Sequence, residues 1–124
     1  MAIIDRLEEI DRRAREVAET LSRPETVADS RRFRDLAREH ARLEQGSRLL
    51  AAYRATAQRL EQAEDMRITE KDAELVALAE DETRSAREEL DGLEQEIRLF
   101  LIPPDPRSGR DIIVELRAGT GGNE

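Results

Sequence analysis

Residues 2–22 read AIIDRLEEIDRRAREVAETLS. Apolar side chains recur here at spacings of 4, 3, 4, 3 and 4 residues, at Ile3, Leu7, Ile10, Ala14, Val17 and Leu21. This heptad spacing places one apolar stripe along an α-helix. Pro24 ends the helix, because the residue before a proline is pushed out of the α region. The stretch therefore predicts an amphipathic helix that packs lengthwise against another helix.

A second helix is predicted to begin after Asp29 or Ser30, either of which can cap it. Its predicted packing stripe consists of Phe33, Leu36, His40, Leu43, Leu50, Tyr53, Ala57 and Leu60. The register slips near Gly46, and glycine inside a helix costs about 1 kcal/mol relative to alanine. We expect a kink or a local irregularity there, and a full break stays open.

A third helix is predicted from about Glu70 to Leu101, with Thr69 as its N-cap and Pro103 as its stop. Its apolar positions are Leu75, Ala79, Ala86, Leu90, Leu93, Ile97 and Phe100. Short connections between helices imply antiparallel neighbours. The predicted fold is mainly α: an antiparallel bundle or coiled coil of three long helices over residues 1–102.

The end of the sequence predicts a second unit. Residues 103–110 are a proline-rich linker, and residues 111–124 open a truncated α+β domain. Ile112–Leu116 alternates as a half-buried strand does, with no predicted partner strand in the chain. The following Gly119, Gly121, Gly122 and Asn123 are interpreted as a structural turn. A phosphate-binding loop is the alternative, although the Gly-Lys-Ser/Thr ending of a P-loop is missing.

The amino-acid composition limits the classes of protein to which this chain can belong. Charged residues make up 40% of the chain and aromatic residues 2%, which fits long helices packed along narrow apolar stripes. The chain has no cysteine, no apolar run near the roughly 18 residues of a membrane span, and no signal-peptide pattern at its start. We expect a cytoplasmic protein with no membrane partner.

Charge is unevenly distributed. Residues 30–62 hold 8 Arg against 4 acidic residues, a net of +4, and residues 63–102 hold 5 basic against 13 acidic residues, a net of −8. Five arginines crowd the start of the second helix: Arg31, Arg32, Arg34, Arg38 and Arg42. They form either a solvated face paired with acidic neighbours or a contact surface for RNA or an acidic partner.

No constellation for catalysis stands out. His40 is the only histidine and lies on the helical stripe, so it is interpreted as a packing residue, as is Tyr53. No carboxylate pair is placed for acid–base work by its spacing. We expect no catalytic site, metal, cofactor or small-molecule substrate.

The stretch from Leu99 to Glu124, with LFLIPPDP followed by ELRAGTGGNE, resembles the bacterial peptide chain release factors. Phe33–Leu43 resembles an upstream segment of that family. The resemblance implies a helical N-terminal domain that packs near the ribosomal stalk base during translation termination. Arg117–Gly122 is similar to type 1 factors, which read UAA and UAG, whereas type 2 factors tend to carry His-Ala-Gly-Ala-Gly-Gly there.

The family's functional motifs are a Gly-Gly-Gln tripeptide, which helps water to attack the peptidyl-tRNA ester, and a codon-reading Pro-x-Thr. Both lie downstream in the family, so we expect neither here and carry over no catalytic residue. The five arginines are candidate ribosome contacts. The alternatives are a self-standing coiled-coil interaction module, which can associate with itself, and a nucleotide-binding fragment built on the glycine turn.

Overall fold

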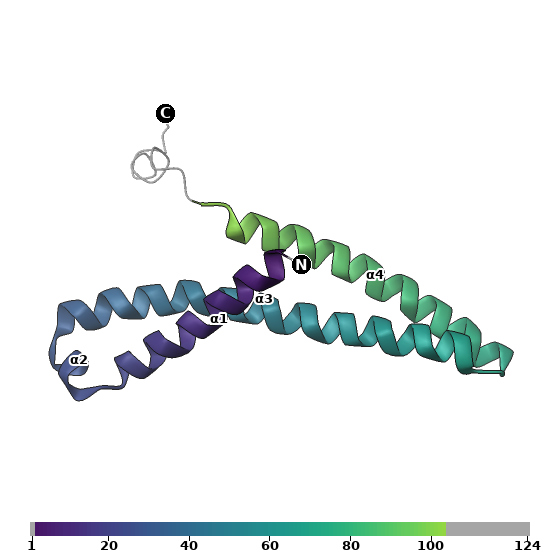
Figure 1. Ribbon diagram of the computed structural model, residues 1–124, viewed down its shortest axis with the longest axis horizontal. Coiled ribbons are helices and arrows are strands. Elements are labelled where there is room, and N and C mark those ends of the chain that lie inside the picture. The colour runs from purple at the N-terminus through teal and green to yellow at the C-terminus, as the bar shows by residue number, and fades with distance from the viewer. Residues whose placement is uncertain (1, 104–124) are drawn as a thin grey trace, which may run out of the picture.

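The computed structural model describes residues 2–103, which form four helices: α1 (Ala2–Leu21), α2 (Pro24–Ala28), α3 (Ser30–Thr69) and α4 (Ala73–Leu101) (Figure 1). The long α3 runs the length of the molecule. Helix α1 packs antiparallel on its first half, and α4 packs antiparallel on its second half. The antiparallel arrangement of three long helices is confirmed. The predicted strand, most of the linker and the glycine turn lie outside the described residues.

The short helix α2 was not predicted. Helix α1 ends at Leu21, as expected ahead of Pro24, but Pro24 then begins a five-residue helix. A proline suits the first turn of a helix because its missing N–H has no partner there. Asp29 caps α3, its side chain accepting a hydrogen bond from the Arg32 N–H at 3.1 Å, as predicted.

The predicted cap at Thr69 is wrong. Helix α3 extends through Thr69, whose hydroxyl donates to the Asp65 carbonyl at 2.9 Å. The N-cap of α4 is Asp72, which accepts from the Glu74 N–H at 2.9 Å. Between the helices, the Glu70 carboxylate accepts from the N–H groups of Lys71 and Asp72. The turn thus satisfies its own backbone donors, and Thr69 is already engaged by the preceding helix.

Helix α3 is continuous through Gly46, so the possible break is excluded. A Cβ atom at this position would lie 2.7 Å from Ile10 Cγ2 of α1 and 3.0 Å from Phe100 Cε2 of α4. Real Cβ contacts essentially never lie below 3.0 Å, so the contact with Ile10 would force a shift. The glycine therefore permits a close approach of α1, α3 and α4 rather than a bend in the backbone.

The main apolar cluster lies at this crossing. Figure 1 shows the start of α1 and the end of α4 meeting over the middle of α3. The buried side chains of the cluster are Leu7, Leu49, Leu50, Ile97 and Leu101, with Ile3, Ile4, Ile10, Tyr53 and Phe100 packed around them. Arg6 also donates to the Leu101 carbonyl at 3.1 Å, which joins α1 to the end of α4.

Helix α3 carries two apolar stripes rather than one. Leu36 and Leu43 pack with Ala14 and Val17 of α1. Beyond the crossing, the buried positions on α3 shift to Leu49, Thr56 and Ala63, on the side of α4. The register slip in the sequence therefore marks a change of packing partner, because α1 and α4 lie against different sides of α3.

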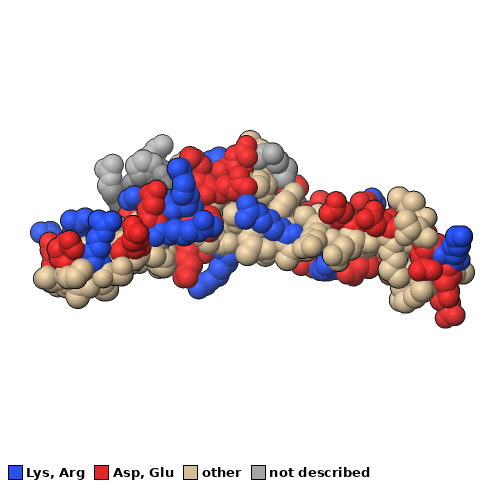
Figure 2. All heavy atoms as spheres, turned by 60° about the horizontal axis from the view of Figure 1, so that its bottom comes forward, with Lys and Arg blue, Asp and Glu red and all other residues tan. Residues whose placement is uncertain are grey.

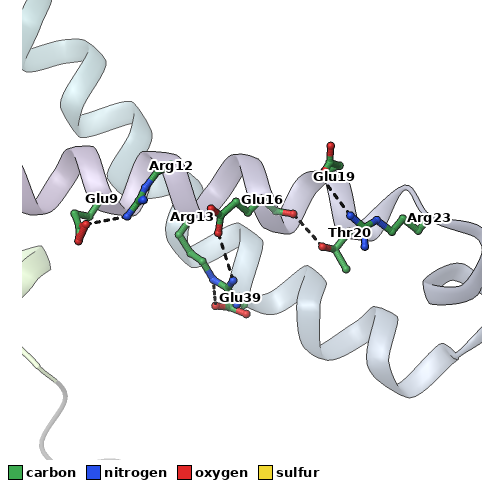
Figure 3. Close-up of polar contacts among 8 residues, drawn as sticks. All are labelled: Glu9, Arg12, Arg13, Glu16, Glu19, Thr20, Arg23 and Glu39. Carbon is green, nitrogen blue, oxygen red and sulfur yellow. Dashed lines mark hydrogen bonds and ion pairs between the residues drawn. The ribbon is translucent and has the colours of Figure 1, made fainter.

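Polar contacts also join neighbouring helices within each half of the molecule. In the α1 half, Arg13 contacts Glu39 of α3 at 3.2 Å, Arg12 pairs with Glu9 of its own helix, and Arg23 after the end of α1 pairs with Glu19 (Figure 3). Such exposed pairs contribute roughly 0–1 kcal/mol each. They orient α1 against α3 more than they stabilise the fold.

The α4 half has a denser network around Arg59. Its guanidinium contacts the Glu82 carboxylate at 2.9 Å and the Glu89 carboxylate at 2.8 Å. The buried Thr56 hydroxyl also donates to Glu89 at 3.0 Å. These hydrogen bonds, that from Arg59 first and that from Thr56 second, lower the pKa of the Glu89 carboxyl, and the two glutamates raise the pKa of Arg59.

A pair of glycine substitutions tests the crossing. Gly46→Ala lowers the free energy of unfolding by about 1–3 kcal/mol, because the added methyl overpacks three helices. Gly92→Ala, where a Cβ meets nothing within 4 Å, raises it by up to about 1 kcal/mol through helix propensity. Urea unfolding measures both values. A Gly46→Ala variant as stable as Gly92→Ala contradicts the packing.

The Glu89 carboxyl predicts a pH dependence. Because its pKa is lower in the folded state, its stabilisation is present above the unfolded pKa of about 4.3 and is lost as the pH falls through the folded value. Glu89→Gln is therefore less stable than the unsubstituted chain at pH 7, and the difference shrinks below about pH 4. Urea midpoints across pH measure this. Glu96→Gln, which removes an exposed glutamate with no ion pair among residues 2–103, is the control. A Glu89→Gln difference that stays constant with pH contradicts the network.

Candidate functional site

The five predicted arginines lie together at the start of α3, and all are exposed. Arg31, Arg34, Arg38 and Arg42 follow one another at spacings of 3, 4 and 4 residues. Such spacings keep side chains on one face, and eleven residues of helix span about 16 Å. We call these four residues the arginine stripe. It faces away from α1, which packs against Leu36 and Leu43, and Arg32 lies off the stripe.

The arginine stripe is unpaired within the described chain. No carboxylate of residues 2–103 lies within 4.0 Å of these arginines, whereas Arg48, Arg54 and Arg59 farther along α3 each contact a glutamate. Within residues 2–103 these arginines therefore form no direct ion pair, and both interpretations of the face stay predictions. On the face that Figure 2 shows, Lys and Arg gather more densely over the half that holds α1, α2 and the start of α3.

The position of the stripe runs against helix electrostatics. A helix N-terminus carries the positive end of the macrodipole, which favours acidic side chains in the first turn. The first turn of α3 has none, and Arg31 and Arg32 stand there instead. These cations do not serve the helix, so their exposed charge is available to an anionic partner.

The remaining predicted residues divide into two groups. His40 is half-buried on α3, and Tyr53 packs against the main apolar cluster. Burial, and secondarily the nearby Glu94 carboxylate, raise the pKa of the Tyr53 hydroxyl. Both fit the interpretation as packing residues. Gly119, Gly121, Gly122 and Asn123 lie outside the described residues, so the structural turn and its phosphate-loop alternative stay predictions.

The expectation that neither release-factor motif occurs needs one correction. Pro24-Glu25-Thr26 matches the letters of Pro-x-Thr. It forms the start of α2, where the Thr26 side chain is 1% exposed. Its hydroxyl has no hydrogen-bond partner among the described residues. A side chain held in this way cannot contact a codon, and the match is one of letters only.

Two searches of the described helices are negative. No three His, Asp or Glu side chains of residues 2–103 are grouped to hold a metal ion. None of the four helices is long and apolar enough to cross a membrane.

Sequence reasoning missed a set of exposed apolar side chains. Leu99 is 70% exposed and Ile102 61%, and Ile68 and Leu78 are exposed near the far end of the α3–α4 hairpin. None of them belongs to a predicted helical stripe. That is the signal that would have found them, because a large apolar residue off the packing face has no partner within its own bundle.

Arginines clustered along one helix face are a pattern that nucleic-acid-binding proteins use, although the pattern alone does not identify a partner. The PCRF domain model matches residues 10–124. Peptide chain release factor 1 of Pelobacter propionicus is 40% identical over 122 residues, which cover 98% of this chain and 34% of that protein. The release factors 1 of Chlorobaculum tepidum and Syntrophomonas wolfei are 38% and 34% identical over the same shares. No solved structure matches the chain significantly.

The chain belongs to the PCRF-domain family, and its similarity is to type 1 peptide chain release factors. This confirms the resemblance drawn from Leu99–Glu124. The chain spans about a third of the length of the curated relatives it matches.

Proposed function

We propose that this chain acts in translation termination, as the N-terminal part of a cytoplasmic factor that directs release of the nascent peptide on the ribosome. The observation that carries the proposal is the 40% identity with peptide chain release factor 1 over 98% of the chain. In this proposal, the ester hydrolysis and the codon reading belong to the Gly-Gly-Gln and Pro-x-Thr regions of a complete factor.

The stop codons proposed are UAA and UAG. Arg117-Ala118-Gly119-Thr120-Gly121-Gly122 is similar to the corresponding turn of type 1 factors. Three relatives named peptide chain release factor 1 support the same type.

The helical part is proposed to dock the factor on the ribosome, near the stalk base, through the arginine stripe. Phosphate oxygens of ribosomal RNA are the anions that such a stripe suits, because guanidinium groups bind phosphate with paired hydrogen bonds. Support comes from the exposure of the stripe and the lack of carboxylate partners among residues 2–103.

The second candidate is a coiled-coil interaction module that associates with itself. Ala57 and Leu60 favour it, because they continue the α1-facing side of α3 beyond the start of α1 and are only half-buried. Sedimentation of the isolated chain separates the two candidates. A concentration-dependent dimer that Leu60→Glu abolishes supports the module, and a monomer at all concentrations removes it.

The arginine stripe predicts a salt-dependent ribosome contact. The test protein is Pelobacter propionicus release factor 1 with this chain in place of its matching residues. Changing Arg31, Arg34, Arg38 and Arg42 to Ala weakens its binding to 70S ribosomes and reduces the salt slope by up to about 3.6, since each phosphate contact contributes roughly 0.7–0.9. In release assays the variant raises KM for ribosomes and leaves kcat unchanged.

A matched control removes the same charge elsewhere. Arg12, Arg15, Arg48 and Arg84 each pair with an acidic residue of their own helix. Changing these four to Ala is expected to leave the salt slope unchanged. Equal effects of the two quadruple variants would mean that net charge, and not the stripe, governs binding.

The 124-residue chain alone is expected to release no peptide from ribosomes programmed with a stop codon. Gly-Gly-Gln, the tripeptide that acts at the ester in the family, does not occur in its sequence. Release of radiolabelled formylmethionine from such ribosomes measures this, with a complete release factor 1 as the positive control. Stop-codon-dependent release by the purified chain would contradict the proposal that ester hydrolysis belongs to the Gly-Gly-Gln region of a complete factor.

A further inference from the structure

The far end of the α3–α4 hairpin holds a groove with apolar walls. Ala63 of α3 and Ala79 of α4 line it and are buried where the two helices meet. Met66 of α3 and Leu78 of α4 line it as well, but Met66 is 36% and Leu78 61% exposed. Two small buried residues between two larger exposed ones leave a hollow at the surface. We call the hollow lined by these four residues the hairpin groove.

The size and the polar border of the hairpin groove limit what it can hold. Its volume is about 260 Å³, below the roughly 300–1,000 Å³ of typical small-molecule sites. Arg59 and Glu82 stand at its border, but they are already paired with each other at 2.9 Å. The groove therefore offers an apolar contact, and it suits a single large side chain better than a whole small molecule.

The surface around the hairpin groove is strongly acidic. Residues 61–82 hold nine acidic residues against Arg67 and Lys71, a net of −7. Only three of the nine, Glu64, Asp81 and Glu82, form ion pairs among residues 2–103. Figure 2 shows acidic side chains next to uncharged surface at this end of the molecule, on the right. The apolar groove is thus set in a surface of uncompensated negative charge.

We propose that the hairpin groove binds a basic amphipathic helix of a protein partner, which inserts one large apolar side chain between Met66 and Leu78. Helices bind grooves in other proteins through apolar anchors of this kind. The proposal concerns the end of α3 opposite the arginine stripe and a partner of opposite charge. It therefore goes beyond the proposed function and does not depend on it.

Charge and spacing favour this occupant. A net charge of −7 attracts Lys and Arg side chains and repels RNA and anionic membranes. Glu74, which has no ion pair among residues 2–103, lies one turn before Leu78 on the same face of α4. Residues one turn apart on a bound helix are separated by the same roughly 6 Å. An apolar anchor at Leu78 thus brings a lysine one turn away from it close to Glu74.

The chain's own remaining residues do not meet this requirement. Residues 104–124 hold four acidic residues against three arginines, so they bring no excess of positive charge. A second copy of the chain does carry cationic residues, in the arginine stripe, so the experiment has to separate it from a foreign partner.

The test adds a helical peptide of alanine and lysine residues with one central leucine to the ¹⁵N-labelled full chain. The peptide is expected to shift the amide NMR signals of Ala63, Met66, Leu78 and Ala79 and to spare Leu99 at the other end of α4. A peptide with serine in place of the leucine is expected to bind about tenfold more weakly, the factor expected for losing one buried leucine contact. Equal binding of the two peptides, or no binding of the leucine peptide, overturns the proposal.

A matched pair of substitutions shows whether the hairpin groove is the contact. Leu78 lines the groove, whereas Ile68 is exposed at the same end of the hairpin and does not line it. Leu78→Ser is expected to weaken binding of the leucine peptide about tenfold, and Ile68→Ser to leave it unchanged. Far-UV circular dichroism confirms that both variants keep their helices. Equal effects of the two substitutions would place the contact elsewhere and overturn the proposal.

Two further measurements test the charge and the identity of the occupant. A peptide with glutamate in place of lysine is expected not to bind, and binding as tight as that of the lysine peptide overturns the proposal. Without any peptide, the signals of Met66 and Leu78 are expected to stay in place as the chain concentration rises. Shifts that grow with concentration show that a second copy of the chain occupies the groove, and they overturn the proposal.

Discussion

The close approach of three helices at Gly46 determines the arrangement of the rest of the molecule. A Cβ atom there would lie 2.7 Å from Ile10 Cγ2 and 3.0 Å from Phe100 Cε2, so glycine lets α1 and α4 approach the middle of α3 more closely than a larger residue would. The contact brings Leu7, Ile97 and Leu101 into one buried cluster. Each outer helix otherwise holds mainly its own half of α3, because α1 and α4 contact each other far less than either contacts α3.

This crossing divides α3 into two halves, and a different helix packs against each. In the α4 half, the ion pairs of Arg59 join α3 to α4 and help to orient the two helices. In the first half, α1 covers the apolar side and leaves the opposite side to the arginine stripe. The charge asymmetry of the sequence therefore becomes a spatial one, with an unpaired cationic face at one end and an acidic hairpin at the other. Such a distribution suits a protein that orients itself on a large anionic partner.

The sequence predicted the helices and their antiparallel order because heptad spacing and prolines are local signals. It predicted the exposure of the five arginines for the same reason. It did not predict the continuity of α3 at Gly46, because a helix that changes partners and a helix that breaks produce the same slip in spacing. The prediction of Thr69 as the N-cap of α4 was wrong because its hydroxyl is engaged by α3, while Asp72 and Glu70 accept the backbone N–H groups of the turn. The apolar side chains of Leu99 and Ile102 lay outside every stripe, so no pattern assigned them a partner.

The chain belongs to the PCRF-domain family and spans about a third of the length of the relatives it matches. Docking of a complete factor through the cationic end of the helices is our proposal. The central claim is that α3 is one uninterrupted helix whose two halves hold different partners. Electron–electron resonance between spin labels at Ser22→Cys and Lys71→Cys, beside the two ends of α3, tests it most directly. A 40-residue helix predicts one narrow distance near about 60 Å. A distance below about 45 Å, or a broad distribution, would mean that α3 bends or breaks at Gly46 and would contradict the account.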